Sequence, residues 1–257
     1  MDWSRAKSII IIALILTNVF LLYTLQVLPK GAEAEIDASS VAKALELKGI
    51  RLESEIPLSR PELAPLTVEY ASEDGQKSLS SYTSLKGDPE EATDGAYAKL
   101  CEDIMESLGI DIKYAVLDSF ERDNTGGKET ARLRYRCEAE GIVLDASSFA
   151  ISFEDGRLKE LKNDWISPLA VGRVKNRILG ASYSLMDFMA EAGNFSEEGQ
   201  GLIIEDIKLV YWLNREGYES GGAATDTALP AWRVSWREEN TGKEGAWYGI
   251  AFEQEDV

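Results

Sequence analysis

Residues 130–138 read Thr-Ala-Arg-Leu-Arg-Tyr-Arg-Cys-Glu and have a strict period of two. Apolar side chains alternate there with three arginines, in the order Arg132, Leu133, Arg134, Tyr135, Arg136 and Cys137. Because successive side chains of a β-strand point to opposite faces of a sheet, the pattern predicts a strand with one apolar and one basic face. The apolar face of such a sheet needs a helix or a second sheet to cover it.

A covering helix is predicted directly upstream, over residues 90–108, where apolar side chains recur at intervals of three and four and Gly109 ends the pattern. These side chains are Tyr97, Leu100, Cys101, Ile104 and Leu108. Strands are predicted over residues 112–120, 130–138 and 147–154, and the turn Asp155-Gly156 leads into a fourth over 158–165. The resulting unit is one helix on one face of an antiparallel sheet.

The same pattern restarts after Ser167-Pro168. A helix over residues 169–191 is predicted from the spacing of Val174, Ile178, Leu185 and Phe188. Three strands follow, over residues 204–213, 231–237 and 246–253. In the middle one, the side chains that share a face are Trp232, Val234 and Trp236.

Three segments of the second half resemble segments of the first in the same order. Residues 112–114 align with 207–209 at an offset of 95, whereas 133–135 align with 232–234, and 149–154 with 248–253, at an offset of 99. Ordered matches at nearly constant spacing indicate an internal repeat. The predicted fold class is therefore α+β, with two similar helix-plus-antiparallel-sheet units over residues 31–165 and 166–257.

The beginning of the first unit is read from turn and capping residues. Asp37 precedes a short predicted helix over residues 41–47, which Gly49 ends. Three prolines between residues 51 and 65 predict extended chain or an edge strand. Residues 66–71 and 78–83 are predicted to form a hairpin.

The N-terminal residues 1–30 are predicted to form a short cytoplasmic tail and a transmembrane helix. Residues 8–29 carry no charge, and a helix of that length extends about 33 Å, against a hydrocarbon core of about 30 Å. Arg5 and Lys7 precede the run, so the N-terminus is expected inside the cytoplasmic membrane and the C-terminal part outside. A cleaved signal peptide ending at Ala32-Glu33-Ala34 is the alternative, although signal peptides have apolar runs of only about 7 to 15 residues.

Polar side chains at mid-depth mark one face of this predicted helix. Asn18 either is tolerated by the bilayer or donates a hydrogen bond to another transmembrane helix, an interaction of about 1 kcal/mol. Thr17 and Ala13 lie near it on the helix. These three residues are the predicted partner-binding face within the lipid bilayer.

Composition argues against several functional classes. The net charge is −18, and residues 1–30 carry +2, so the remaining residues carry −20, which disfavours nucleic acid as a partner. The chain has no histidine, so Ser-His and Cys-His catalytic pairs are excluded. Its two cysteines, Cys101 and Cys137, are expected to be buried thiols, with a disulfide as the alternative.

Neighbouring carboxylates are the remaining candidates for catalysis, as in glycoside hydrolysis. The pairs Glu102-Asp103 and Glu205-Asp206 are examples, but adjacent side chains on a helix or strand point in different directions. No catalytic, metal-binding or cofactor-binding residue is predicted, and the protein is expected not to be an enzyme.

The basic face of residues 130–138 has two interpretations. Neighbouring acids neutralise Arg132, Arg134 and Arg136, or the three arginines form a docking strip for an acidic partner, since arginine is enriched at interfaces. The second interpretation makes these arginines partner-binding residues.

Both ends of the chain resemble one family. The opening Met1-Asp2-Trp3-Ser4-Arg5-Ala6-Lys7, followed at once by an apolar span, resembles the start of the YycI family. Residues 207–212 (Ile-Lys-Leu-Val-Tyr-Trp), 229–234 (Leu-Pro-Ala-Trp-Arg-Val) and 247–252 (Trp-Tyr-Gly-Ile-Ala-Phe) resemble its C-terminal domain and the related YycH protein. Between about residues 57 and 94 the chain is similar only in general pattern.

This resemblance implies regulation rather than catalysis. YycI-like proteins of Gram-positive bacteria are membrane-anchored partners of YycH, and the two together modulate WalK, the sensor kinase of a cell-wall two-component system. The expected partners are therefore a YycH-like protein and a WalK-like sensor kinase, contacted through the membrane helix and the ectodomain. The alternatives are a PepSY-like protease inhibitor, a secreted binding module and a membrane-tethered wall enzyme, which gene neighbours would help to distinguish.

Overall fold

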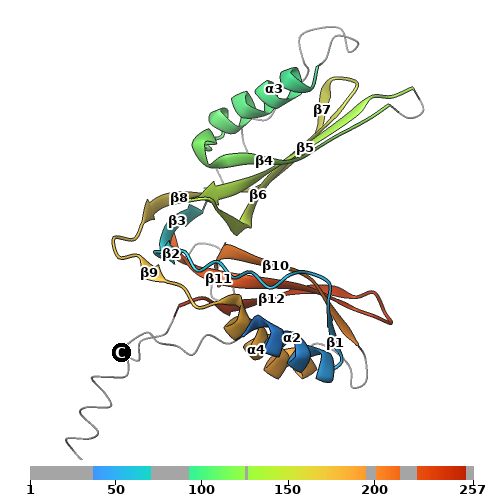
Figure 1. Ribbon diagram of the computed structural model, residues 1–257. Coiled ribbons are helices and arrows are strands. Elements are labelled where there is room, and N and C mark those ends of the chain that lie inside the picture. Colours follow the sequence, from blue (N-terminus) through green and yellow to red (C-terminus); the bar gives the residue numbers. More distant parts are fainter. Residues whose placement is uncertain (1–36, 71–92, 125–126, 195–200, 215–224, 253–257) are drawn as a thin grey trace, which may run out of the picture.

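The computed structural model describes residues 37–70, 93–124, 127–194, 201–214 and 225–252. Over these residues the fold is α+β, with three α-helices, a ten-stranded mixed sheet and a separate two-stranded sheet (Figure 1). Within the described part of the chain, no helix is long and apolar enough to cross a membrane. The predicted membrane helix, residues 8–29, lies outside it.

One group of strands forms an antiparallel layer beneath a single helix. The helix is α3 (Asp94–Ser107), and the strands, in spatial order, are β4 (Ala115–Asp123), β5 (Thr130–Ala139), β6 (Ile142–Glu154) and β7 (Arg157–Asp164). Figure 1 shows α3 on one side of these strands. The 3-10 helix η3 (Ile112–Tyr114) connects α3 to β4.

A second group has the same order of a helix followed by three antiparallel strands. These are α4 (Ala181–Glu191), the 3-10 turn η4 (Ala192–Asn194), β10 (Leu202–Trp212), β11 (Thr225–Glu238) and β12 (Glu244–Ile250). Two N-terminal elements join it: α2 (Ala38–Leu47) packs beside α4, and β1 (Ile50–Leu52) pairs in parallel with β10. Figure 1 shows α2 and α4 on the same side of these strands.

Short pairings join the two groups. β6 pairs in parallel with β10 through Val143 with Val210 and Leu144 with Tyr211. The first residues of β11 pair with β3 (Leu66–Tyr70), which also pairs with β8 (Ile166–Val171). The two-stranded sheet contains β2 (Glu62–Leu63) and β9 (Asn176–Arg177).

Each group has its own hydrophobic core. The first core contains Tyr97 and Cys101 from α3 against Leu133 and Phe149 of the sheet. The second is built mainly from α2, α4, β10 and β11, and its members include Val41, Leu45, Leu185, Phe188, Trp232, Val234 and Trp236. The predicted boundary between the two units, at residues 165 and 166, stays a prediction. Helix α2 and strand β1 fall within the predicted first unit, but they contribute residues to the second core.

Several local predictions are confirmed. Asp37 caps α2, its carboxylate accepting a hydrogen bond from the Ser39 amide, and Gly49 follows with a φ of +77°. In β5 the arginine side chains face outward, and the alternating apolar residues Leu133, Tyr135 and Cys137 are buried.

The helix predicted over residues 169–191 is wrong in its first half. Residues 166–171 form strand β8, and α4 begins only at Ala181, after Gly180. Val174 is 68% exposed, and Ile178 reaches the second core from non-helical chain whose amide donates to the Pro61 carbonyl at 3.3 Å. Pairing of β8 with β3 therefore outweighs the helical spacing of these apolar residues.

The predicted hairpin is also wrong in its pairing. Residues 78–83 lie outside the described residues, but the two sides of residues 66–69 are already taken by β8 and β11. β3 is thus an interior strand that joins distant segments, and not one arm of a local hairpin.

The predicted repeat needs a different register in its outer strands. In each group the central strand pairs with both neighbours, and the equivalent triads are Phe120–Leu133–Ile151 and Leu209–Trp232–Gly249. The predicted offset of 99 residues holds between the two central strands. Between the first strands of the triads the offset is 89 in place of the predicted 95, and between the third strands it is 98 in place of 99. A slip of one residue matters because it exchanges the two faces of a strand.

Cys101 and Cys137 are free, buried thiols, as expected, and not a disulfide. Cys101 lies on α3 and Cys137 on β5, and both belong to the first core. Burial raises the pKa of each thiol to about 12. Both side chains are therefore neutral at physiological pH and act as small apolar groups.

Candidate partner-binding groove

A groove of about 260 Å³ crosses β4, β5, β6 and β7 on the face opposite α3. Its lining residues are Ser119, Glu121, Arg132, Leu133, Arg134, Ala150, Ile151, Ser152, Glu160 and Lys162. The groove therefore contains two of the three arginines that the sequence marks as partner-binding residues.

Small side chains on β6 explain why this face is hollowed. Ser148, Ala150 and Ser152 point to the same face as the arginines, because they pair with Arg136, Arg134 and Arg132 respectively. On the other side of β6, Ala150 pairs with Lys162 and Ser152 with Glu160. Short residues on β6 thus form a floor between longer side chains on β5 and β7.

The three arginines differ in their partners. The Arg136 guanidinium lies 3.0 Å from the Asp118 carboxylate and 4.0 Å from that of Glu138, so neighbouring acids do neutralise it. Arg132 and Arg134 are exposed, and neither forms an ion pair or a side-chain hydrogen bond with any residue that the structure describes. Two guanidiniums at the groove are therefore open to an external anion.

Charge is distributed unevenly along the groove. The row Ser119–Arg134–Ala150–Lys162 contains two cations and no acid, whereas the row Glu121–Arg132–Ser152–Glu160 contains one cation between two acids. Lys162 also makes an ion pair of 3.1 Å with Asp164, but both side chains are exposed, so this pair contributes about 0 to 1 kcal/mol. The positive end of the groove is consequently at Arg134 and Lys162.

Sequence reasoning identified the arginines but missed Lys162 and Ala150. The turn at Asp155-Gly156 indicates that the following strand lies beside β6, but it does not by itself show which residues lie opposite Ala150. A bulge between Ser152 and Phe153 shifts this register, so counting from the turn alone gives the wrong face.

A second polar cluster lies where β6 meets the other group. The Asp145 carboxylate on β6 accepts hydrogen bonds from Arg233 on β11 and from the Tyr248 hydroxyl on β12, each at 2.5 Å. The Arg233 guanidinium is also 3.6 Å from Asp206. Burial, together with the hydrogen bond to Asp145, raises the pKa of Tyr248, so its hydroxyl stays a donor. No motif or spacing in the sequence indicates this cluster.

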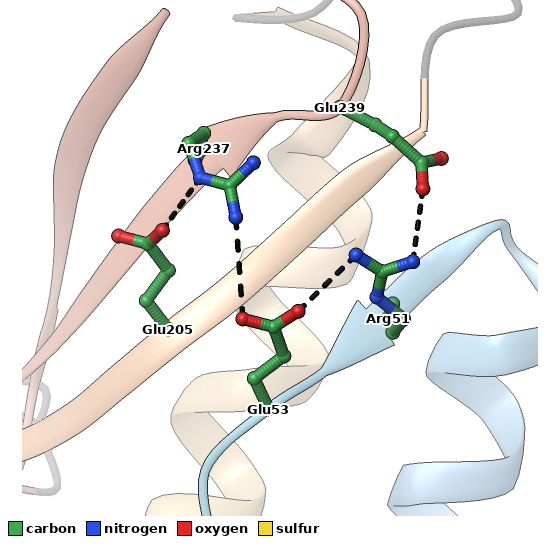
Figure 2. Close-up of polar contacts among 5 residues, drawn as sticks. All are labelled: Arg51, Glu53, Glu205, Arg237 and Glu239. Carbon is green, nitrogen blue, oxygen red and sulfur yellow. Dashed lines mark hydrogen bonds and ion pairs between the residues drawn. The ribbon is translucent and has the colours of Figure 1, made fainter. Parts of the chain in front are cut away.

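The carboxylates considered for catalysis have separate surroundings. Glu205 accepts a hydrogen bond from Arg237 at 2.6 Å, while Asp206 forms ion pairs with Lys208 and Arg233. Glu205 lies at one end of a chain of ion pairs that continues in the order Arg237, Glu53, Arg51 and Glu239 (Figure 2). These ion pairs connect β1 and the residue that follows it to β10 and β11, which is a structural role.

The other adjacent acids, Glu102 and Asp103, are both exposed on α3. Over the described ranges, no group of three or more His, Cys, Asp or Glu residues is arranged to hold a metal ion. The predicted membrane residues Ala13, Thr17 and Asn18 lie outside those ranges. The groove with Arg132 and Arg134 is therefore the candidate site that the structure describes.

Comparison with known proteins gives no further assignment: no family model matches the chain, and no curated protein matches it. The resemblance to the YycI family accordingly stays a prediction from the sequence.

Proposed function

We propose that this protein is a membrane-anchored, non-catalytic regulator of a sensor histidine kinase in a cell-wall two-component system. Residues 8–29 are its membrane helix, and the rest forms an extracellular α+β domain of two similar units. It acts together with a YycH-like protein, as the resemblance to the YycI family implies. No cofactor or nucleic acid takes part.

The observation that carries this proposal is the pair Arg132 and Arg134. Both are exposed in a groove, and neither has an ion-pair partner among the described residues, although the chain carries a net charge of −18. Arginines that stay unpaired on such an acidic protein suit a binding surface for an acidic partner. A binding surface, together with a membrane helix, is what a regulator without catalytic groups requires.

The proposed mechanism is selective binding of one kinase state. A regulator shifts the equilibrium between two kinase states only if it binds one of them more tightly. In this proposal such selective binding operates through helix contacts in the membrane and through the ectodomain groove.

The ectodomain part is tested by reversing the two charges. The double variant Arg132→Glu, Arg134→Glu should reduce crosslinking to the kinase or the YycH-like protein in intact membranes at least about tenfold, because like charges then face each other. A reporter of the response regulator should change in parallel. Crosslinked partners are identified by mass spectrometry.

A matched control keeps the same change in net charge. Lys43 on α2 and Lys99 on α3 are exposed and lie away from the groove, so Lys43→Glu with Lys99→Glu should leave crosslinking unchanged. Equal loss in both double variants would mean that net charge alone matters, and would count against the groove. Undiminished crosslinking of the arginine variant would do the same.

The membrane part is tested separately. Replacing Thr17 and Asn18 with leucine removes polar groups while keeping the segment apolar, so insertion should persist but co-purification with the kinase or YycH-like protein should weaken about fivefold. Ala13→Leu, which adds bulk on the same face, should weaken it as well. Unchanged co-purification and signalling in these variants would remove this helix face from the mechanism.

A further inference from the structure

We propose that Arg134, Ala150 and Lys162 form a subsite for a carboxylate, which an aspartate or glutamate side chain of a partner protein occupies. This inference rests on the proposed function only for the identity of the partner protein. The subsite is the positive row of the groove, in which Ala150 lies between the two cations on neighbouring strands.

The second group of strands already contains such an interaction. Arg233 lies on the central strand β11, as Arg134 lies on the central strand β5, and the two positions are equivalent by their strand pairing. Arg233 binds the carboxylate of Asp145, which comes from β6, a strand outside the β10–β12 group. The protein therefore uses this position to receive an acidic side chain from a neighbouring segment.

The equivalent position in the first group is open. Tyr248 pairs with Arg233 and donates to the bound carboxylate, whereas Ala150 pairs with Arg134 and presents only a methyl group. The space above Ala150 is part of the groove of about 260 Å³, large enough for one acidic side chain and its neighbours. Lys162 on β7 stands where it can supply the second donor that Tyr248 supplies in the other group.

A protein carboxylate suits the groove better than a phosphate group. The next row holds Glu121 and Glu160, which repel a multiply charged anion but tolerate a single carboxylate over Ala150. Ser119 and Ser152 beside the cations offer hydroxyl groups that bind the backbone of an extended segment. Since side chains on one face of an extended segment recur about every 7 Å, the partner needs an acid at one position and a neutral polar residue two positions away.

The probe is a fluorescein-labelled peptide with one central glutamate among serines, tested by fluorescence anisotropy at low ionic strength. The full chain is used in micelles of an uncharged detergent. The glutamate peptide should bind at least about tenfold more tightly than the same peptide with glutamine, because only the carboxylate forms charge-assisted hydrogen bonds. Arg134→Gln and Lys162→Gln should each weaken its binding about fivefold and leave the glutamine peptide unaffected.

Two further variants separate the subsite from general effects. Lys99→Gln removes an equal charge from the opposite side of the sheet and should not change binding. Ala150→Leu fills the floor without altering charge, and should abolish the preference for glutamate while the circular dichroism spectrum stays native. Retention of that preference in Ala150→Leu would overturn the proposed position of the carboxylate.

Other results overturn the inference directly. Equal affinity for both peptides, or no effect of Arg134→Gln, would show that no carboxylate subsite exists there. Competition by inorganic phosphate without binding of the glutamate peptide would show a phosphate site instead. If the glutamate peptide does not bind but charge-dependent crosslinking persists in membranes, the subsite is wrong and the proposed function stands. If the peptide binds but that crosslinking is absent, the subsite stands and the proposed function is wrong.

Discussion

Replacing Trp232 with alanine is expected to lower the free energy of unfolding by about 4 kcal/mol, the usual cost of truncating a large buried aromatic side chain. Trp232 is only 2% exposed and lies in the second core, between the β-sheet and the helices α2 and α4. Its indole nitrogen also donates a hydrogen bond to the Leu179 carbonyl at 2.8 Å, just before α4 begins. Alanine removes both the packing and the bond that holds this segment against the sheet.

Urea unfolding, followed by far-ultraviolet circular dichroism of the full chain in micelles, measures this change. Trp232→Phe keeps most of the volume but not the donor, and should cost about half as much. Trp212→Ala is the matched control, since Trp212 is only half-buried and its ring stacks on that of Tyr248, with the ring centroids 5.9 Å apart. A loss below about 2 kcal/mol for Trp232→Ala, or an equal loss for Trp212→Ala, would contradict the packing described for the second core.

Regular local patterns were sufficient to predict the layer that carries the groove. The alternation in β5 follows from the pleat of a single strand, and the spacing of Tyr97 and Cys101 follows from one helical turn. Both patterns reflect burial on one face only, which is a local property of the sequence. Fold class and the face carrying the arginines were therefore predictable.

Features that depend on distant pairing were not predictable in this way. Residues 169–171 fall within a helix that was predicted from the spacing of apolar residues further along, but they belong to β8, with which β3 pairs from about a hundred residues upstream. The register of the repeat failed at its outer strands for a similar reason: it is set by pairing with the central strand, and each first strand also contains a one-residue bulge, at Asp118 or at Glu205. Short matching segments of sequence do not reveal this pairing or these bulges.

The candidate site illustrates the same division. Arg132 and Arg134 were visible from alternation alone, while their lack of partners depends on where β4 and β7 place their acids. Arg136, which looks identical in the sequence, is paired because the bulge turns Asp118 toward it. Whether an arginine is free to bind a partner is thus a tertiary property.

The junction between the two groups of strands gives the second large expected effect. Asp145→Ala should lower the free energy of unfolding by about 2 to 3 kcal/mol, because it removes one member of a partly buried ion pair. The Arg233 side chain is 26% exposed and that of Asp145 is 16% exposed. The Arg233 Nε is already buried without a hydrogen-bond partner in the described part of the chain, so losing Asp145 leaves the guanidinium with Asp206 alone, at 3.6 Å.

Urea unfolding again provides the measurement, and two variants show which interaction is responsible. Tyr248→Phe removes only the hydroxyl donor and should cost about 1 kcal/mol. The double variant Asp145→Ala, Arg233→Met removes both charges and should recover part of the loss, since no unpaired charge is then buried. Arg233→Met is also measured alone. If the loss of unfolding free energy in the double variant equals the sum of the losses in Asp145→Ala and Arg233→Met, the pair is not coupled and another contact must join β6 to β11. Recovery would instead show that this carboxylate and guanidinium are coupled across the junction, and that an unpaired charge at this position is costly.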